Sequence, residues 1–263
     1  MHYFSRGRGA PPLVFVHGFT CDHSDWRFQV NHFQSQRQVL ACDLRGHGSS
    51  PGRPAECTIG HYGGDVAALL ANLDLEKSIL VGHSMGCRVV LEAARLDPER
   101  VCALVLVDGG RRASGDAQQS ESAMRAMIQM MGYADFADAL FSQMFLRPSA
   151  QSQAIIARAK RMPAESAIAA WLSMVRWDAE HMESALAAVR VPLTAIQSTT
   201  INAEGKRVPL KAGQALAWFD LIKQHVPAAR LEIVPDTGHF TQLEAAASVN
   251  RLIAEACRSA VAP

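Results

Sequence analysis

The sequence predicts an α/β fold: a mostly parallel, twisted sheet with helices on both faces and an all-helical insertion. Short apolar runs of strand length alternate with segments of helical periodicity, which is typical of βα units around a parallel sheet. The alternation stops between residues 111 and 190, where only helix-like segments follow one another. The chain has 263 residues, 49 % of them hydrophobic, and is therefore long enough to bury a sizeable core.

Six apolar runs are predicted as strands. Two of them, at 78–84 and 101–109, are continuously apolar, as expected of central strands that are covered on both faces. Helices are predicted at 61–74 and 85–98, and the second should stop before Pro98. The six predicted strands are residues 12–18, 38–46, 78–84, 101–109, 191–197 and 230–235.

The break in the alternation predicts how the chain is divided. We expect residues 1–110 and 191–263 to form one α/β core, and residues 111–190 to form a helical cap inserted into it. The cap segment is rich in methionine. These side chains form either an adaptable binding surface or the packing of a small helical layer. They are Met124, Met127, Met130, Met131, Met144, Met162 and Met174.

Composition argues against several classes of partner. The chain carries 26 Lys and Arg against 25 Asp and Glu, without long runs of either sign, so it lacks the footprint of a nucleic-acid or polybasic membrane surface. It shows no secretion-signal pattern at its start and no apolar run of about eighteen residues. We expect a cytoplasmic protein that acts on a small molecule without membrane insertion; the oligomeric state stays open. The scattered cysteines lack CxxC spacing, so no metal site is expected.

The stretch Gly82-His-Ser-Met-Gly86 is the strongest candidate for chemistry. It lies where the strand at 78–84 passes into the helix that begins at Met85, which is the context of a nucleophile elbow. Such a turn needs small residues on both sides of the serine, and Gly82 and Gly86 provide them. Ser84 is therefore the predicted nucleophile.

A serine nucleophile needs a base and donors for an oxyanion. His239 follows the last predicted strand, in a loop that can reach the carboxyl edge of the sheet, and is the predicted base. The amide of Met85, directly after the nucleophile, is one predicted oxyanion donor. The amide of Phe19, after the turn at Gly18, is the other. His23 follows this loop and is a candidate substrate contact, together with Phe19, Trp171 and Phe240.

Five motifs occur in an order that resembles the α/β-hydrolase superfamily, in its esterase, lactonase, perhydrolase and C–C hydrolase branch. The resemblance covers about Pro12 to Ile253 and places the helical insertion at the cap position of the family. Because this fold supports many chemistries, the resemblance implies the fold and the type of catalytic residues, but not the substrate. The motifs are HGF (17–19), DLRGHGSS (43–50), GHSMG (82–86), LVLVDGG (104–110) and GHF (238–240).

The triad acid is the point at which the sequence departs from this pattern. Most members carry an aspartate after the strand equivalent to 191–197, but residues 199–201 of this chain contain none. Some members take the acid from the preceding strand, and Asp108 stands at its end. Glu204, a few residues past the usual position, is the alternative. We expect Asp108 to be the triad acid, because the chemistry needs only a buried carboxylate that orients the imidazole.

These residues predict a serine esterase that cleaves small, hydrophobic esters or lactones through an acyl-enzyme intermediate, without a cofactor. Two alternatives stay open. The same fold supports cofactor-free dioxygenases, perhydrolases and C–C hydrolases, and it also supports receptors that bind a ligand without turning it over.

Overall fold

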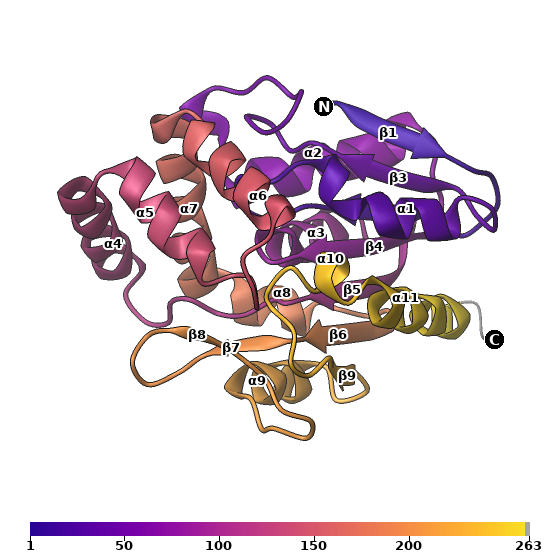
Figure 1. Ribbon diagram of the computed structural model, residues 1–263. Coiled ribbons are helices and arrows are strands. Elements are labelled where there is room, and N and C mark those ends of the chain that lie inside the picture. The colour runs from indigo at the N-terminus through magenta and orange to yellow at the C-terminus, as the bar shows by residue number, and fades with distance from the viewer. Residues whose placement is uncertain (261–263) are drawn as a thin grey trace.

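The computed structural model, which describes residues 1–260, contains one seven-stranded sheet in the order β1-β3-β2-β4-β5-β6-β9 (Figure 1). The edge strand β1 runs antiparallel to β3, and all other neighbours are parallel. The predicted fold class is therefore confirmed. The strands are Tyr3–Arg6 (β1), Leu13–Val16 (β2), Val39–Cys42 (β3), Ser78–His83 (β4), Val101–Val107 (β5), Leu193–Gln197 (β6) and Arg230–Ile233 (β9).

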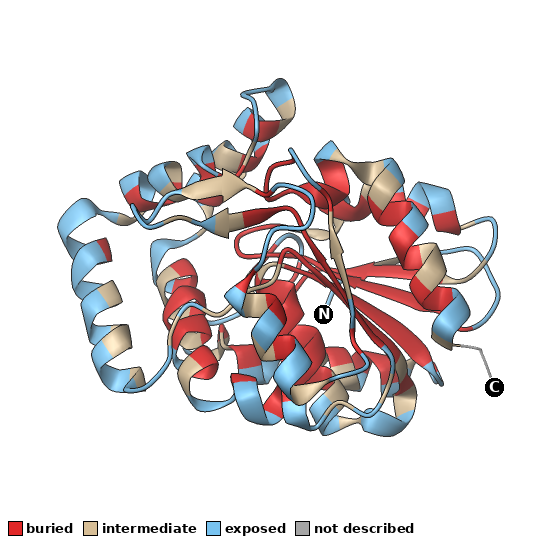
Figure 2. Ribbon diagram, turned by 90° about the horizontal axis from the view of Figure 1, so that it is seen from below, coloured by how far each residue is buried: buried red, intermediate tan, exposed pale blue. Residues whose placement is uncertain are grey.

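Helices cover both faces of the sheet. They are Arg27–Phe33 (α1), Ile59–Asn72 (α2), Met85–Leu96 (α3), Ala217–His225 (α9), Thr241–Glu244 (α10) and Ala246–Ala260 (α11), with short 3-10 turns at His23–Trp26, Pro54–Glu56 and Pro98–Arg100. Successive strand side chains point to opposite faces. Leu13 and Phe15 accordingly share a cluster with residues of α1 and α11, whereas Val14 and Val16 share one with α2 and α3. Figure 2 shows the buried strands between helices whose outer sides are exposed.

The two helices predicted in the first half are confirmed as α2 and α3. Thr58 begins α2, because its hydroxyl accepts a hydrogen bond from the backbone N–H of His61. Leu96 ends α3, two residues before Pro98, where the proline ring disfavours a further helical turn.

The helical insertion lies between β5 and β6, beyond the carboxyl ends of the strands (Figure 1). A buried ion pair ties it to the core: Arg88 of α3 donates to both carboxylate oxygens of Asp178 of α7, at 2.7 and 2.6 Å. These side chains are 3 % and 0 % exposed. The helices of this cap are Ala117–Met131 (α4), Tyr133–Ser142 (α5), Ala150–Arg161 (α6), Ala164–Glu180 (α7) and Met182–Ala187 (α8).

The cap methionines divide between the two roles that the sequence left open. Met144 and Met174 are buried and pack in the core cluster, whereas Met130 of α4 is 84 % exposed. Some of the cap methionines therefore pack in the core, and others lie on the surface.

Three strands were not predicted. The edge strand β1 is half exposed, and Thr199–Ile201 (β7) and Arg207–Pro209 (β8) form a separate two-stranded hairpin directly after β6. No helix within residues 1–260 has the length and apolar character needed to cross a membrane.

Candidate active site

Ser84 occupies a strained turn between β4 and α3. Its φ is 54° and its ψ is −110°, a conformation that side chains rarely adopt. The flanking glycines make the turn possible: a Cβ on Gly82 would lie 2.3 Å from the carbonyl oxygen of Gly86, and one on Gly86 would lie 2.4 Å from that of Val16. The Ser84 N–H donates to the Val107 carbonyl at 2.9 Å, which holds the turn against β5.

His239 faces this serine, with its Nε2 2.9 Å from the Ser84 Oγ. Its backbone is fixed on two sides, because its N–H donates to the Met144 carbonyl at 2.7 Å and its carbonyl lies 2.9 Å from the ring Nε2 of His83. Burial, followed by the nearby Arg207 charge, lowers the pKa of His239 well below its ordinary value. The imidazole is therefore neutral at pH 7, as a base must be before it takes a proton.

Asp108 lies behind His239, with its Oδ1 3.8 Å from the His239 Nδ1. It follows β5 with a φ of 47°. The N–H groups of Ser198 and Thr199 each donate to Oδ1 at 3.1 Å, and the hydroxyls of Ser198 and Thr241 donate to Oδ2. Burial alone would raise the pKa of Asp108, but His239 and these donors lower it to about 2. Asp108 is therefore a buried, ionised carboxylate beside the imidazole.

Glu204 lies elsewhere. It is exposed in the turn between β7 and β8, and it does not line the cavities that contain Ser84. Thr199, whose position lacks the usual aspartate, contributes in another way: its hydroxyl donates to Asp108 Oδ1 at 3.2 Å and lies 3.5 Å from His239 Nδ1. Of the two candidate acids, the structure thus brings only Asp108 beside His239.

The two candidate oxyanion donors lie on either side of Ser84. Met85 is the first residue of α3, where a helix leaves its N–H groups without a carbonyl partner in the preceding turn. A Cβ on Gly18 would lie 3.2 Å from the Ser84 Cβ, so the turn that carries Phe19 runs directly beside the serine. This turn is closed by the Cys21 N–H, which donates to the Gly18 carbonyl at 3.2 Å.

Two cavities meet at Ser84 and His239. The narrow one, of about 10 Å³, has room for about one water molecule, and its lining includes Phe19, Trp171 and Phe240 from the predicted set of contacts. The wide one, of about 640 Å³, extends past Asp108 toward the β7–β8 hairpin and α9. Most of the space beside Ser84 therefore lies in the wide cavity.

The comparison with family models agrees with this arrangement. The model described as "Alpha/beta hydrolase family" matches residues 13–252. The chain belongs to this family. Among curated relatives, it is 30 % identical over 251 residues to the dihydrolipoyllysine-residue acetyltransferase component of the acetoin cleaving system of Pseudomonas putida. That match covers 93 % of this chain and 63 % of the relative, so the chain spans less than two thirds of the relative's length.

Solved structures of other α/β hydrolases share the fold at low identity. A thermophilic esterase from Thermogutta terrifontis superposes with a TM-score of 0.77 at 22 % identity, over 99 % of this chain and 94 % of that one. The enol-lactonase of Burkholderia xenovorans LB400 gives 0.75 at 21 % identity, over 97 % and 95 %. The architecture is therefore shared with enzymes of differing substrates.

Sequence reasoning misplaced one residue of this α/β hydrolase. His23 does not line either cavity at Ser84; it lines a further cavity of about 470 Å³ with Asp43 and His47. Its Nδ1 and its backbone N–H both lie 2.8 Å from Asp43 Oδ1. These contacts hold His23 at Asp43, outside the two cavities that contain Ser84.

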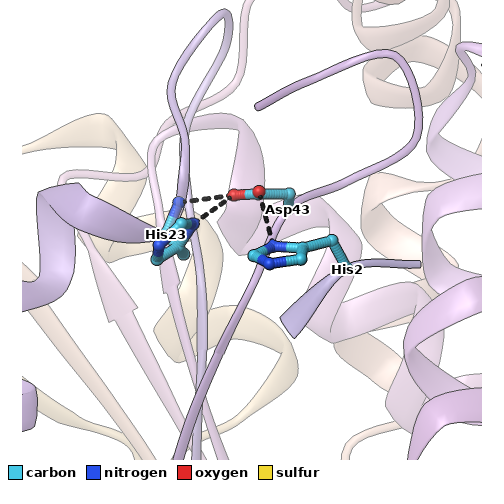
Figure 3. A group of neighbouring side chains, drawn as sticks. All are labelled: His2, His23 and Asp43. Atoms are coloured by element: carbon cyan, nitrogen blue, oxygen red, sulfur yellow. Dashed lines mark hydrogen bonds and ion pairs between the residues drawn. The ribbon is translucent and has the colours of Figure 1, made fainter. Parts of the chain in front are cut away.

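The group His2, His23 and Asp43 has residue types that suit a metal ion (Figure 3). The geometry of the three side chains instead fits a structural hydrogen-bond network around Asp43. Each Asp43 oxygen already has two hydrogen-bond partners. Oδ1 contacts the backbone N–H and the Nδ1 of His23, and Oδ2 contacts the His2 Nδ1 and the Ser49 N–H, both at 2.9 Å. The contacts fasten the start of β1 and two loops together, and we assign the group no catalytic role.

The residues that sequence reasoning missed are arginines. Arg112, after β5, and Arg207, at the start of β8, line the wide cavity with Ser84 and His239. The pair Arg111-Arg112 after the predicted strand was the one available signal, but nothing in the sequence placed it beside Arg207.

Proposed function

We propose that this α/β hydrolase is a serine esterase of small carboxylic esters or lactones that works through an acyl-enzyme. One observation carries the proposal: His239 Nε2, neutral and buried, lies 2.9 Å from the Oγ of a serine held in a strained turn. The esterase and lactonase structures that share the fold support the same reaction class.

The first half of the reaction forms the acyl-enzyme. Ser84 Oγ attacks the ester carbonyl carbon while its proton passes to His239 Nε2, and the amides of Met85 and Phe19 stabilise the oxyanion. Asp108 stabilises the imidazolium that results. His239 then gives the proton to the departing alcohol oxygen as the C–O bond breaks.

The second half returns the enzyme to its starting state. Water attacks the acyl carbon, His239 takes the water proton and returns it to Ser84 Oγ, and the acid is released. The relatives of the acetoin system are named acetyltransferase components, and an acyl-enzyme supports transfer as well as hydrolysis, depending on which acceptor attacks it.

The test is hydrolysis of p-nitrophenyl acetate by the wild type, Ser84→Ala and Ser122→Ala. Ser122 is an exposed serine of α4 and is the matched control. We expect kcat to fall by about four orders of magnitude in Ser84→Ala and to stay at the wild-type value in Ser122→Ala. Wild-type turnover no faster than that of Ser84→Ala would refute the proposal and favour a receptor. Oxygen uptake with heteroaromatic substrates that persists in Ser84→Ala would instead assign the site to dioxygenase chemistry.

A further inference from the structure

The wide cavity at Ser84 concentrates positive charge in a chain whose overall charge is nearly balanced. Four arginines line it: Arg88, Arg111, Arg112 and Arg207. The acidic residues of its lining are Asp108 and Asp220. The Asp108 carboxylate already accepts hydrogen bonds from the hydroxyl and amide donors behind His239. Asp220 is an exposed residue of α9.

Two of the four arginines have structural partners. Arg88 is neutralised by the buried Asp178, and Arg111 pairs with Glu183 of α8 at 2.7 Å. The Arg88–Asp178 pair joins the core to the cap, whereas the Arg111–Glu183 pair lies within the cap; the charges of both arginines are balanced.

The other two arginines have no such partner. Within residues 1–260, no carboxylate oxygen lies within 4.0 Å of a guanidinium nitrogen of Arg112 or Arg207. Arg112 lies over the ring of Trp171, 4.4 Å from its centroid, and Arg207 donates to the Thr199 hydroxyl at 2.7 Å. A flat aromatic face and a hydroxyl orient the two groups without neutralising them.

The two guanidinium groups also repel each other. Arg112 is exposed and Arg207 is partly buried, and the positive charges of Arg207 and Arg88 both act on Arg112. Both groups are still cationic at neutral pH. An anion placed between them relieves the repulsion and accepts charge-assisted hydrogen bonds.

Arg112 and Arg207 lie near the atoms that would react with the substrate, so an anion bound to them would be close to Ser84. Arg112 lines both the narrow cavity and the wide one, and Arg207 is linked through Thr199 to the side of His239 that faces Asp108. Both groups are therefore within the same chamber as Ser84.

We propose that the wide cavity binds a carboxylate carried by the substrate, with Arg112 and Arg207 as its ligands. The inference rests on the proposed esterase function and narrows it to esters or lactones of anionic compounds. The planar guanidinium fork matches the two oxygens of a carboxylate, and the wide cavity, of about 640 Å³, also has room for the uncharged part of the molecule.

Two matched pairs of esters test this, each differing by one charge. Mono-p-nitrophenyl adipate and its methyl ester place the charge on the acyl side; p-acetoxybenzoate and methyl p-acetoxybenzoate place it on the alcohol side. The value of kcat/KM is divided by the uncatalysed hydrolysis rate of each ester. We expect the anionic member of at least one pair to be preferred by about 10- to 100-fold, a preference that declines as salt is added.

The variants Arg112→Met, Arg112→Lys and Arg207→Met identify the ligands. We expect Arg112→Met to bring the ratio of anionic to neutral kcat/KM close to unity, mainly through KM, and Arg112→Lys to recover part of it. Arg207→Met should also lower this ratio. Arg147→Met, at an exposed arginine outside these cavities, is the matched control and should keep the wild-type ratio.

The outcomes separate this inference from the proposed function. Hydrolysis of the neutral esters that depends on Ser84, with no preference for the anionic member of either pair, would overturn the carboxylate site and leave the esterase intact. A preference that survives in both Arg112→Met and Arg207→Met would overturn the assignment of ligands. A wild type that hydrolyses none of the four esters faster than Ser84→Ala does would instead refute the proposed function.

Discussion

The most informative substitution is Asp108→Asn, because it removes one charge behind His239 at nearly unchanged size; its NH2 group replaces an oxygen that accepts from the Ser198 and Thr241 hydroxyls. The amide that replaces the carboxylate keeps a carbonyl oxygen, which can still accept from the N–H groups of Ser198 and Thr199, so the loop after β6 should keep its position. The His239 Nδ1 lies 3.8 Å from Asp108 Oδ1, and this separation sets the attraction between the carboxylate and the imidazolium that forms when His239 takes the serine proton. At an effective dielectric constant of about 20, this attraction is about 4 kcal/mol.

A loss of about 4 kcal/mol corresponds to a decrease in kcat of about a thousand-fold. The assay is the kcat of p-nitrophenyl acetate hydrolysis, with thermal unfolding as a check that the variant folds. Glu204→Gln is the matched control, and we expect its kcat to equal that of the wild type because Glu204 is exposed on the β7–β8 turn. A well-folded Asp108→Asn that keeps more than about a tenth of kcat would refute the reasoning, as would a comparable loss in Glu204→Gln.

Three further predictions concern stability and pH. Asp178→Ala leaves Arg88 buried without its counter-charge and should lower the free energy of unfolding in urea by about 3–5 kcal/mol. Gly86→Ala forces a Cβ against the backbone of β2 and should cost about 3 kcal/mol in the same assay. Burial lowers the pKa of His83 from 6.5 to about 4, so the unfolded chain binds the extra proton. Its stabilising contribution is complete above pH 6.5 and declines by up to about 1.4 kcal/mol per pH unit as the pH falls toward 4, measured by urea unfolding at each pH.

Each of the two substitutions has a control. Asp138→Ala breaks an ion pair with Lys160 in which both side chains are more than two-fifths exposed, and it should cost less than about 1 kcal/mol. Gly64→Ala, in α2, has open space for its Cβ and should not destabilise the protein. Equal losses for Asp178→Ala and Asp138→Ala, or for the two glycine variants, would contradict the packing described above. An unfolding free energy that is constant between pH 6.5 and 4 would contradict the third prediction.

The central strands and the turn at Ser84 could be predicted because their causes are local. Strand β4 is buried on both faces, so residues 79–81 at its centre are all apolar, and the strained φ of Ser84 requires the glycines on both sides of it. Strand β1 lies at the edge with half-exposed side chains, so no apolar run marks it.

The rest of the site depends on contacts between distant segments. His23 lies close to Phe19 along the chain, and sequence distance could not show that Asp43 turns it away from Ser84. Arg112 and Arg207 converge from the start of the cap insertion and from the hairpin. The position of Asp108 depends on β6, which is followed by the Ser198 and Thr199 amides that donate to its carboxylate, and Glu204 lies exposed on the turn of the β7–β8 hairpin.

Covalent labelling tests most directly whether His239 activates Ser84 as a nucleophile. The folded protein is treated with a fluorophosphonate, and the modified peptide is located by tandem mass spectrometry. We expect a single adduct on Ser84, strong suppression of labelling in His239→Ala, and unchanged labelling in Ser122→Ala. An unlabelled Ser84 in folded wild-type protein, or labelling that proceeds equally well without His239, would contradict that claim.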